Sequence, residues 1–410
     1  MSQNVSPAPR LIGFDAHPDS FTAAILRGDK PATAIVEKTF NKLPLSQLNS
    51  WVDKHTTAQD AFVLEASGNS FHLFRRLAEL GRTAKVLESC QMGKLKEAHA
   101  NNDKISAIRI GKAYLAGTAK EVWVPDDKTQ QRRDLFHAHR KAVKYSVQSR
   151  NSLLSYLSDN GVRLKKGVRL ATDPQAVETL RKLADWSTSQ GRVIEGLLMQ
   201  LRHAEQQRAH WHSLIAHEVA TEPKLLAIVR LCGVRELIAF ALGAIIGDIQ
   251  RFADPKKLVK YIGLNPAFDD SGNNQWHGGI GGHGRKDLRA LLIEAAQAIL
   301  RSRHEMAHWG KKLLARRGAI KLAVAALARK LTVAVWYLMM GRWTPLEEID
   351  QRLALKVGKL ITRVGTACLQ QMGKTRKQLR EQICQSLKDK TVYTLQPEPK
   401  LNAQPRAAIA

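Results

Sequence analysis

Closely spaced β-strand patterns near the N-terminus constrain the fold of this chain most. LIGFDAH, FTAAILRG and ATAIVEKTF are apolar or β-branched runs separated by turn residues, and AFVLEAS is a fourth such run. SFHLFRRLAELG has helical periodicity and ends in glycine, and TAKVLES then predicts a fifth strand. We therefore expect an α/β domain built on a mixed sheet, over residues 1–127.

Three consecutive strands followed by a strand, a helix and a further strand is the order of a ribonuclease-H-like fold, the class that includes RuvC-like domains. In that order Asp15 ends the first strand and Glu65 ends the fourth. These strands are neighbours in such sheets, so the two carboxylates can share a divalent cation such as Mg²⁺. Each acid alone is also typical of an ordinary turn, so the prediction depends on the set.

A third acid opens the helical pattern NNDKISAIRIGKAYLAG. Asp103 stands at its start and Ser106 follows one helical turn later, so both can face the same site. We predict that Asp15, Glu65 and Asp103 are catalytic metal ligands.

The middle of the chain, residues 128–220, is helical and rich in Lys and Arg. It predicts a long helical pair, of the coiled-coil kind, whose exposed faces contact nucleic acid or a second subunit. A solvated charged face is the alternative interpretation. The following region, residues 221–345, is mainly helical, with a tight turn at Cys232–Gly233–Val234. Residues 346–410 predict a basic helical extension that ends in a disordered tail, LQPEPKLNAQPRAAIA.

Ser271 lies in a turn-rich segment of this C-terminal region. A short apolar run ends in Asn265-Pro266 and leads to it, and the glycine-rich stretch NNQWHGGIGGHG follows. Glycines let a phosphate approach the backbone, and a basic helix N-terminus attracts anions. The same pattern is typical of a glycine-rich hairpin in which Ser271 only caps a turn, and both interpretations stay open on spacing alone.

Positive charge is concentrated after Ser271 and is high in the whole chain. The candidate nucleic-acid contacts are Arg285, Lys286, Arg289, Lys311, Lys312, Arg316 and Arg317. Over 410 residues, 64 Lys and Arg oppose 37 Asp and Glu, which gives a net charge of +27. This excess favours a polyanionic partner, above all nucleic acid.

The sequence shows no clear pattern for disulfide bonds, for a signal peptide or for a membrane span. The cysteines lack CxxC spacing, so they indicate neither a disulfide framework nor a zinc site. MSQNVSPAPR has no signal-peptide core, and charged residues at Arg230, Arg235 and Glu236 interrupt the longest apolar candidate span. We expect a soluble cytoplasmic protein with no membrane partner.

These blocks together resemble the insertion-sequence one-ten family of DEDD transposases, with its eleven-eleven subgroup and the related Piv-type invertases. LIGFDAHPDSF is similar to the family's first-aspartate strand, and VLEASGNSFHLFRRLAELG to its glutamate strand and helix. NNDKISAIRIGKAYLA matches the segment that usually carries two aspartates three residues apart. LCGV stands where the family has a Pro-Gly-Ile-Gly hairpin, and RFADPKKLVKYIGLNPAFDDSG resembles the block with the C-terminal serine.

The resemblance covers nearly the whole chain and implies an RNA-guided DNA transposase, a bacterial enzyme acting at the nucleoid. A non-coding guide RNA from the element (bridge RNA or seekRNA) would pair with donor and target DNA. The active site would combine the carboxylate domain of one subunit with the serine transposase domain of another. The helical middle would carry dimerisation, and the synapse would be a tetramer.

One departure from the family pattern falls at Ser106, which stands in place of the fourth carboxylate. A hydroxyl is a weaker ligand, so Ser106 is a substitute ligand, or Asp126 or Asp127 replaces it, or one metal suffices, or the site is impaired. The favoured mechanism is attack of Ser271 on a Mg²⁺-bound phosphate. The alternatives are a metal-dependent nuclease of the Holliday-junction type and a non-catalytic nucleic-acid-binding protein.

Overall fold

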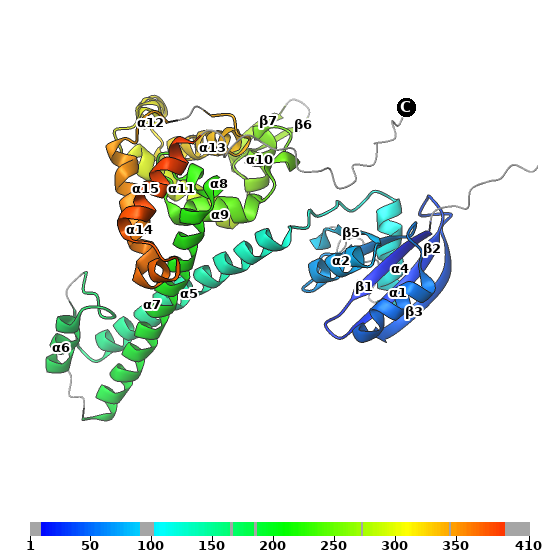
Figure 1. The fold of residues 1–410 in the computed structure, drawn as a ribbon, viewed down its shortest axis with the longest axis horizontal. Helices are drawn as coiled ribbons and strands as arrows, with labels where there is room; N and C mark the ends of the chain where they lie inside the picture. The colour runs from blue at the N-terminus through cyan, green and yellow to red at the C-terminus, as the bar shows by residue number, and fades with distance from the viewer. Residues whose placement is uncertain are drawn as a thin grey trace, which may run out of the picture. The chain divides into compact units, whose positions relative to one another are not determined.

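The protein is a mixed α/β structure rich in helices, seen in a computed structural model that describes residues 10–90, 102–164, 167–183, 187–271, 274–343 and 346–389. The chain divides into two compact units, an N-terminal unit (Met1–Asp126) and a C-terminal unit (Asp127–Ala410) (Figure 1). The C-terminal tail that we predicted to be disordered lies outside the described residues.

A five-stranded sheet forms the centre of the N-terminal unit, in the order β3-β2-β1-β4-β5. β1 pairs antiparallel with β2, and β2 with β3, whereas β1–β4 and β4–β5 are parallel. The predicted strands are thus all present. Their bounds are β1 Arg10–Ala16, β2 Ser20–Arg27, β3 Ile35–Pro44, β4 Ala61–Glu65 and β5 Thr83–Leu87.

Helices cover both faces of this sheet. On one face α1 (Leu48–His55) and α2 (Ser70–Glu79) pack over Phe14, Phe21 and Phe62, and the rings of Phe14 and Phe21 stack with centroids 4.9 Å apart. α4 (Asp103–Leu115) covers the other face, where Leu11 and Val63 point. The sequence analysis did not predict α1, which follows the short 3-10 turn Leu45–Gln47.

The predicted long helical pair is present in the C-terminal unit as α5 (Asp127–Asp159) and α7 (Ser189–Thr221), each of 33 residues. Thr188 begins α7 by accepting a hydrogen bond from the Gly191 amide. At the far end of the pair, α6 (Pro174–Leu183) packs its Leu180 with Leu153 of α5 and Leu198 of α7.

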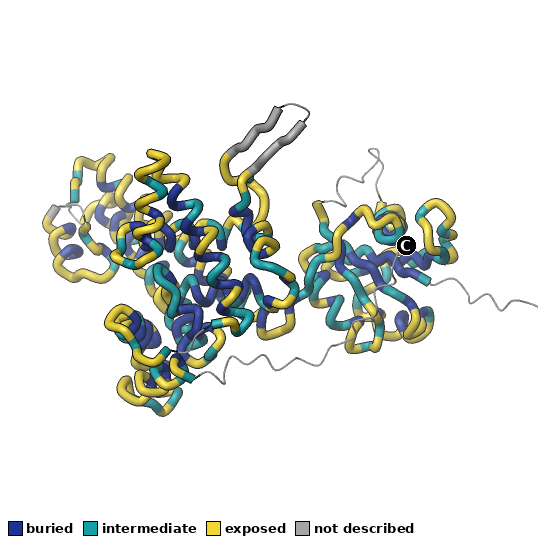
Figure 2. Tube along the Cα trace, turned by 90° about the horizontal axis from the view of Figure 1, so that it is seen from above, coloured by how far each residue is buried: buried dark blue, intermediate teal, exposed yellow. Residues whose placement is uncertain are grey.

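The rest of the C-terminal unit is a helical globule with one hairpin, and it shares a single apolar core. The predicted turn at Cys232–Gly233–Val234, between α8 (Pro223–Ile228) and α9 (Glu236–Ile246), contains Gly233 at φ 77°. Figure 2 shows the buried interior of each unit in dark blue. The elements are α8 Pro223–Ile228, α9 Glu236–Ile246, the 3-10 turn Ile249–Arg251, α10 Pro255–Ile262, β6 Pro266–Ser271, β7 Asn274–Ile280, α11 Lys286–Leu300, α12 Glu305–Arg317, α13 Ile320–Met339, α14 Gln351–Gln371 and α15 Arg376–Lys388.

Helix α13 corrects one expectation. Among the described residues it is the one helix long and apolar enough to cross a membrane by length and composition, with a mean hydropathy of 1.5. The sequence analysis found no such run, which was wrong. Ala323, Leu327 and Leu331 of α13 are fully buried in the core of the unit, so its apolar character is used for packing.

Candidate functional site

Two of the predicted carboxylates lie at one edge of the N-terminal sheet. β1 and β4 are parallel, and Phe14 pairs with Leu64. Asp15 and Glu65 directly follow these residues, so both stand at the carboxyl ends of neighbouring strands, and both are partly buried. The sheet topology therefore brings together the two acids that the strand order predicted.

Asp103 reaches this edge because α4 lies unusually close to β1. A Cβ atom on Gly13 would stand 2.0 Å from the backbone oxygen of Ala107, and one on Gly111 would stand 2.7 Å from Leu26 Cδ1. The contact at Gly13 is with backbone, which cannot move aside as the Leu26 side chain can, so only glycine permits it. Asp103 is the first residue of α4, one turn before Ala107, and the close approach places its carboxylate beside the end of β1.

The structure adds His17, which the sequence analysis did not select. One possible ligand atom from each of Asp15, His17 and Asp103 lies within 4.8 Å of the others. Ligands bound at about 2.1 Å to one ion are at most about 4.2 Å apart, so small side-chain adjustments suffice for a shared cation. Among the described acids, Glu65, Asp126 and Asp127 are not members of this cluster. Ser106 is partly buried, one helical turn after Asp103 on α4.

The ring of His17 is oriented toward Asp103. Its Nε2 lies 3.5 Å from Asp103 Oδ1, and this nitrogen is buried without a hydrogen-bond partner in the described part of the chain. Asn69 Nδ2 donates to the backbone oxygen of His17 at 2.8 Å and ties the turn after β1 to the start of α2. A buried nitrogen without a hydrogen-bond partner is costly, so this nitrogen is suited to binding a cation.

Lys42 also faces the carboxylate cluster. Its Nζ lies 3.7 Å from Asp103 Oδ2, and its backbone is in the left-handed region at φ 51°. The Lys42 amide donates to Thr22 Oγ1 at 3.1 Å, next to an irregular stretch of the β2–β3 ladder. This ammonium group can neutralise Asp103 or contact a phosphate.

Ser271 ends β6 and pairs with Asn274 of β7, so the glycine-rich segment is a two-stranded hairpin. The side chains of residues 267–278, including Ser271, lie outside the described residues. Asp269 and Asp270 precede Ser271 in the sequence and could act as its base, and their side chains lie outside the described residues for the same reason. The backbone thus gives the position of Ser271 along the hairpin.

The base of this hairpin is a crossing of two backbones. Gly263 (φ 80°) and Gly284 (φ 88°) touch there, and a Cβ on Gly263 would stand 1.9 Å from the His283 oxygen. Arg289 Nη1 donates to the carbonyls of Ile262 and Gly263, both at 3.3 Å, and of His283 at 2.7 Å. The predicted phosphate-binding Arg289 therefore also clamps the hairpin base.

Arg285 has a similar internal partner. It donates two hydrogen bonds to Asp287, Nε to Oδ1 at 3.1 Å and Nη2 to Oδ2 at 2.7 Å, and Arg140 lies 3.8 Å from the same carboxylate. Burial raises the pKa of Asp287, but the Arg285 hydrogen bonds outweigh it and hold that pKa below its usual value. Asp287 is therefore a poor proton acceptor for a nearby serine.

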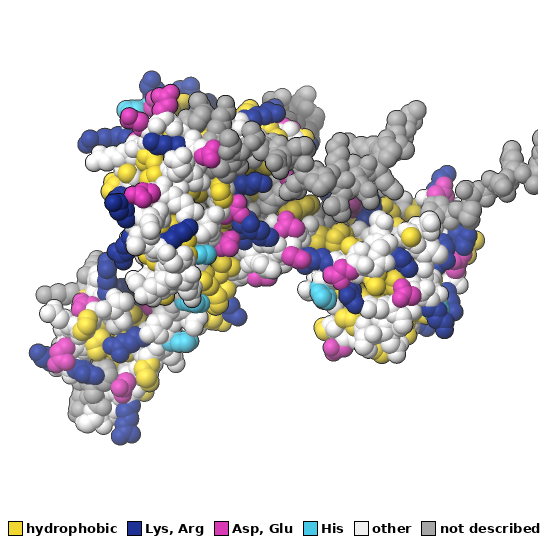
Figure 3. Space-filling model, in the orientation of Figure 1, with side chains coloured by type: hydrophobic (Ala, Val, Ile, Leu, Met, Phe, Trp, Pro, Cys, Tyr) yellow, Lys and Arg dark blue, Asp and Glu magenta, His cyan; other side chains and the backbone are white. Residues whose placement is uncertain are grey.

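The remaining predicted cations are exposed. Lys286 is exposed at the start of α11, and the second basic cluster lies along α12. Figure 3 shows Lys and Arg side chains spread over both units with acidic ones among them. The exposed members of the second cluster are Lys311, Lys312, Arg316 and Arg317.

The known proteins that this chain resembles in sequence are transposases. Residues 227–310, from α8 into α12, match the model of the family described as "Transposase IS116/IS110/IS902 family". The chain is 25% identical over 286 residues to the transposase for insertion sequence element IS1111A of Coxiella burnetii, which covers 69% of this chain and 78% of that protein. It is 24% identical over 339 residues to the transposase for IS1328 of Yersinia enterocolitica, covering 80% and 96% respectively. A probable family 20 transposase of Pseudomonas aeruginosa is 26% identical over 282 residues, covering 67% and 82%.

Proposed function

We propose that this chain, a member of the IS116/IS110/IS902 transposase family, moves its insertion sequence by cutting and rejoining DNA at a metal site on the N-terminal sheet. The observation that carries the proposal is the cluster of Asp15, His17 and Asp103, with the buried, unbonded Nε2 of His17 aimed at a carboxylate. The proposal treats the N-terminal unit as a RuvC-like domain and residues 221–345 as the serine transposase domain.

The ligand set would be Asp15, Asp103 and His17, with Glu65 beside them. Ser106 could add only a neutral hydroxyl oxygen, so we assign the place of the missing carboxylate to His17. A bound divalent cation would neutralise the scissile phosphate and hold it in place. Carboxylates suit Mg²⁺ and Mn²⁺, whereas imidazole suits softer ions, so His17 should move the preference from Mg²⁺ toward Mn²⁺.

Ser271 would be the nucleophile. Its Oγ forms a bond to phosphorus while one phosphorus–oxygen bond to a deoxyribose breaks, and the serine proton balances the proton taken up by the departing oxygen. The phosphoserine ester retains the bond energy for rejoining, so the reaction needs no ATP. Because Arg285 neutralises Asp287, the base for Ser271 would be Asp269, Asp270 or a carboxylate from the N-terminal domain of another subunit.

The partners would be donor DNA, target DNA and an element-encoded guide RNA. Sequence recognition by base pairing leaves the protein to contact backbones, which suits a net charge of +27. The long pair α5 and α7 would join two subunits, and two dimers would form the synaptic tetramer. Its substrates would place the protein in the bacterial cytoplasm.

The metal site is tested by titration calorimetry with Mn²⁺ and Mg²⁺ in the absence of DNA. His17→Ala should weaken Mn²⁺ binding at least tenfold, and Asp103→Asn should weaken both ions. His72→Ala, at an exposed histidine of the same unit, is the matched control and should change neither. Unchanged Mn²⁺ affinity in both His17→Ala and Asp103→Asn would contradict this ligand set.

The nucleophile is tested with labelled DNA carrying the element ends and the flanking non-coding transcript. Label attached to Ser271 by mass spectrometry supports the transposase mechanism. Free phosphate ends, with Ser271→Ala still cutting, would mark a hydrolytic nuclease instead. No cleavage by the unmodified chain under any metal would mark a binding protein.

A further inference from the structure

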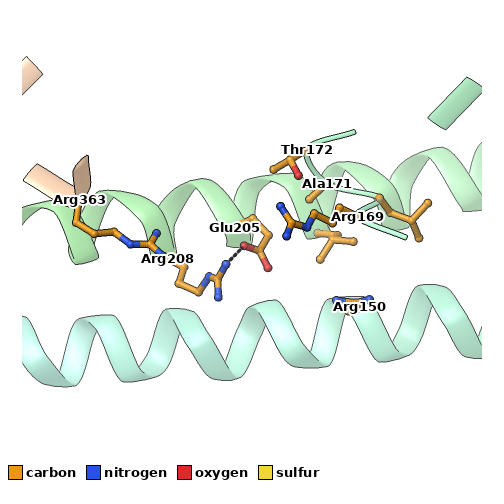
Figure 4. A pocket seen from close by; sticks show the side chains of 9 residues that line it. Arg150, Arg169, Ala171, Thr172, Glu205, Arg208 and Arg363 are labelled. Atoms are coloured by element: carbon orange, nitrogen blue, oxygen red, sulfur yellow. Dashed lines mark ion pairs between the residues drawn. The ribbon is translucent and has the colours of Figure 1, made fainter. Parts of the chain in front are cut away.

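An arginine-lined pocket lies in the C-terminal unit, away from the serine hairpin in sequence. It has a volume of about 450 Å³ and is bounded by α5, α7, the segment before α6, and α14. Figure 4 shows Arg169 and Arg150 toward one end, Arg208 with Glu205 in the middle, and Arg363 at the other end. The remaining lining residues are Leu170, Ala171, Thr172 and Leu201.

The charges in this pocket do not balance. Four arginines face one acid, Glu205, which pairs with Arg208 and accepts a hydrogen bond from Ser146 Oγ. Arg150 Nη2 donates to the Val168 oxygen at 3.3 Å. In the part of the chain that the structure describes, the side chains of Arg169 and Arg363 make no hydrogen bond or ion pair.

The two arginines without partners are held in place through their backbones. The amides of Thr172 and Asp173 donate to the Arg169 oxygen at 3.1 and 2.9 Å and shape its turn. Arg363 lies on α14 beside Val364, whose oxygen accepts from Ser213 Oγ of α7 at 2.6 Å. Leu170 and Leu201 are buried and give the pocket an apolar floor.

We propose that this pocket binds a nucleic-acid strand, with phosphodiesters at Arg169 and Arg363 and one sugar or base over the floor formed by Leu170 and Leu201. Guanidinium forks match phosphate oxygens in pairs. The volume exceeds what one inorganic phosphate fills, and arginines at both ends suit successive phosphates of a strand. An acidic peptide offers the same charge without the planar base that the apolar floor would accept.

The test is equilibrium binding of a fluorescent 20-nucleotide RNA to the full chain, in EDTA so that strand cleavage plays no part. The variant Arg169→Gln with Arg363→Gln removes the two cations without hydrogen bonds. Affinity should fall about tenfold, and the slope of log affinity against log salt should fall by about 1.4, since each lost single-strand phosphate contact is worth about 0.7. The matched control, Arg192→Gln with Arg376→Gln, removes two exposed arginines elsewhere in the unit and should change the slope much less.

Arginine modification by phenylglyoxal provides a second readout on the unmodified protein. Bound RNA should protect Arg169 and Arg363 but not Arg192, as mapped by mass spectrometry. The pocket assignment is overturned if neither the slope nor the protection changes. Equal protection by millimolar phosphate or a nucleoside triphosphate would assign the pocket to a small anion, and equal protection by polyglutamate would assign it to an acidic protein. Failure of the metal or serine chemistry would leave these outcomes unaffected.

Discussion

The carboxylate edge of the N-terminal sheet and the base of the serine hairpin both contain charged side chains, but the two regions differ in how well these side chains are hydrogen-bonded. At the hairpin base, Arg289 donates to three carbonyls and Arg285 makes two hydrogen bonds to Asp287. At the sheet edge, Asp103 lies 3.5 Å from His17 Nε2 and 3.7 Å from Lys42 Nζ, and both distances are too long for good hydrogen bonds.

This difference in hydrogen bonding indicates which region holds the backbone in place and which can bind a ligand. Charged groups that already make good hydrogen bonds hold the backbone in place, and they have few donors or acceptors available for a ligand. The buried Nε2 of His17, which has no hydrogen-bond partner among the described residues, carries an unfavourable energy that a nearby cation can relieve. We infer that the hairpin base positions Ser271, while the sheet edge takes the ion.

The largest expected effect comes from the glycine that creates the sheet-edge cluster. Gly13→Ala places a methyl group 2.0 Å from the Ala107 oxygen, and that backbone atom cannot rotate away. We expect a loss of about 3 kcal/mol in unfolding free energy, the upper end for overpacking, together with lost Mn²⁺ binding. Gly68→Ala, which meets nothing within 4 Å, is the control in urea denaturation. Equal stability of the two variants would show that α4 can move away from β1 and accommodate the added methyl group.

A buried histidine of the C-terminal unit sharpens the comparison, because its Nδ1 also lacks a hydrogen-bond partner among the described residues. His139 is buried against His212, and burial lowers its pKa to about 4. Unlike His17, it belongs to no cluster of possible metal ligands in the described residues. We therefore interpret it as a neutral core group.

The sign of the pH effect follows from this lowered pKa. Between about pH 6.5 and 4 the unfolded chain binds a proton at His139 that the folded chain does not, so stability falls as pH falls, by roughly 3 kcal/mol in all. Burial raises the pKa of Glu236, but its hydrogen bond with His212 outweighs burial and lowers that pKa to about 2. Protonation of Glu236 in the unfolded chain therefore extends the loss of stability below pH 4.5. Thermal denaturation at several pH values measures it. His139→Gln should reduce the dependence of stability on pH between about pH 6.5 and 4, and the substitution His137→Gln at an exposed position should not.

The clamp at the hairpin base gives the next effect. Arg289→Met removes the donor for three carbonyls and should cost about 2 kcal/mol in stability, because the partly buried carbonyls of Ile262 and Gly263 lose their partner. DNA cutting should fall with it. Lys286→Met, at an exposed neighbour on α11, should leave stability unchanged, weaken DNA binding and reduce its salt dependence. If the two variants behave alike, Arg289 acts as a phosphate contact and the hairpin base does not need it.

The smallest effect has the opposite sign. Lys42 is mostly exposed and competes with a cation for Asp103, so Lys42→Met should tighten Mn²⁺ binding by about twofold, the size expected for an exposed ion pair. Lys30→Met removes an exposed lysine elsewhere in the unit and serves as the control in the same titration. Weaker binding in Lys42→Met would mean that the lysine supports the site.

Local pattern alone determined the strands β1 to β5, the helices α2 and α4, the long pair α5 and α7, and the positions of Asp15 and Glu65 at strand ends. Those features depend on periodicity and turn residues that are close together in the chain. The apolar run of α13 was present in the sequence but overlooked. Ser271 was located on a turn-rich segment, and its chemistry stays a prediction.

Only the tertiary structure revealed that His17 joins Asp103, that Arg289 holds the hairpin base, and that Arg169 and Arg363 share a pocket. These contacts join residues far apart in the sequence, and the first two depend on glycines where two backbones meet. A glycine in the sequence looks the same whether it faces solvent, as Gly68 does, or touches a helix, as Gly13 does. The physical reason is that a close backbone approach is a property of two segments, and no local pattern of one segment encodes it.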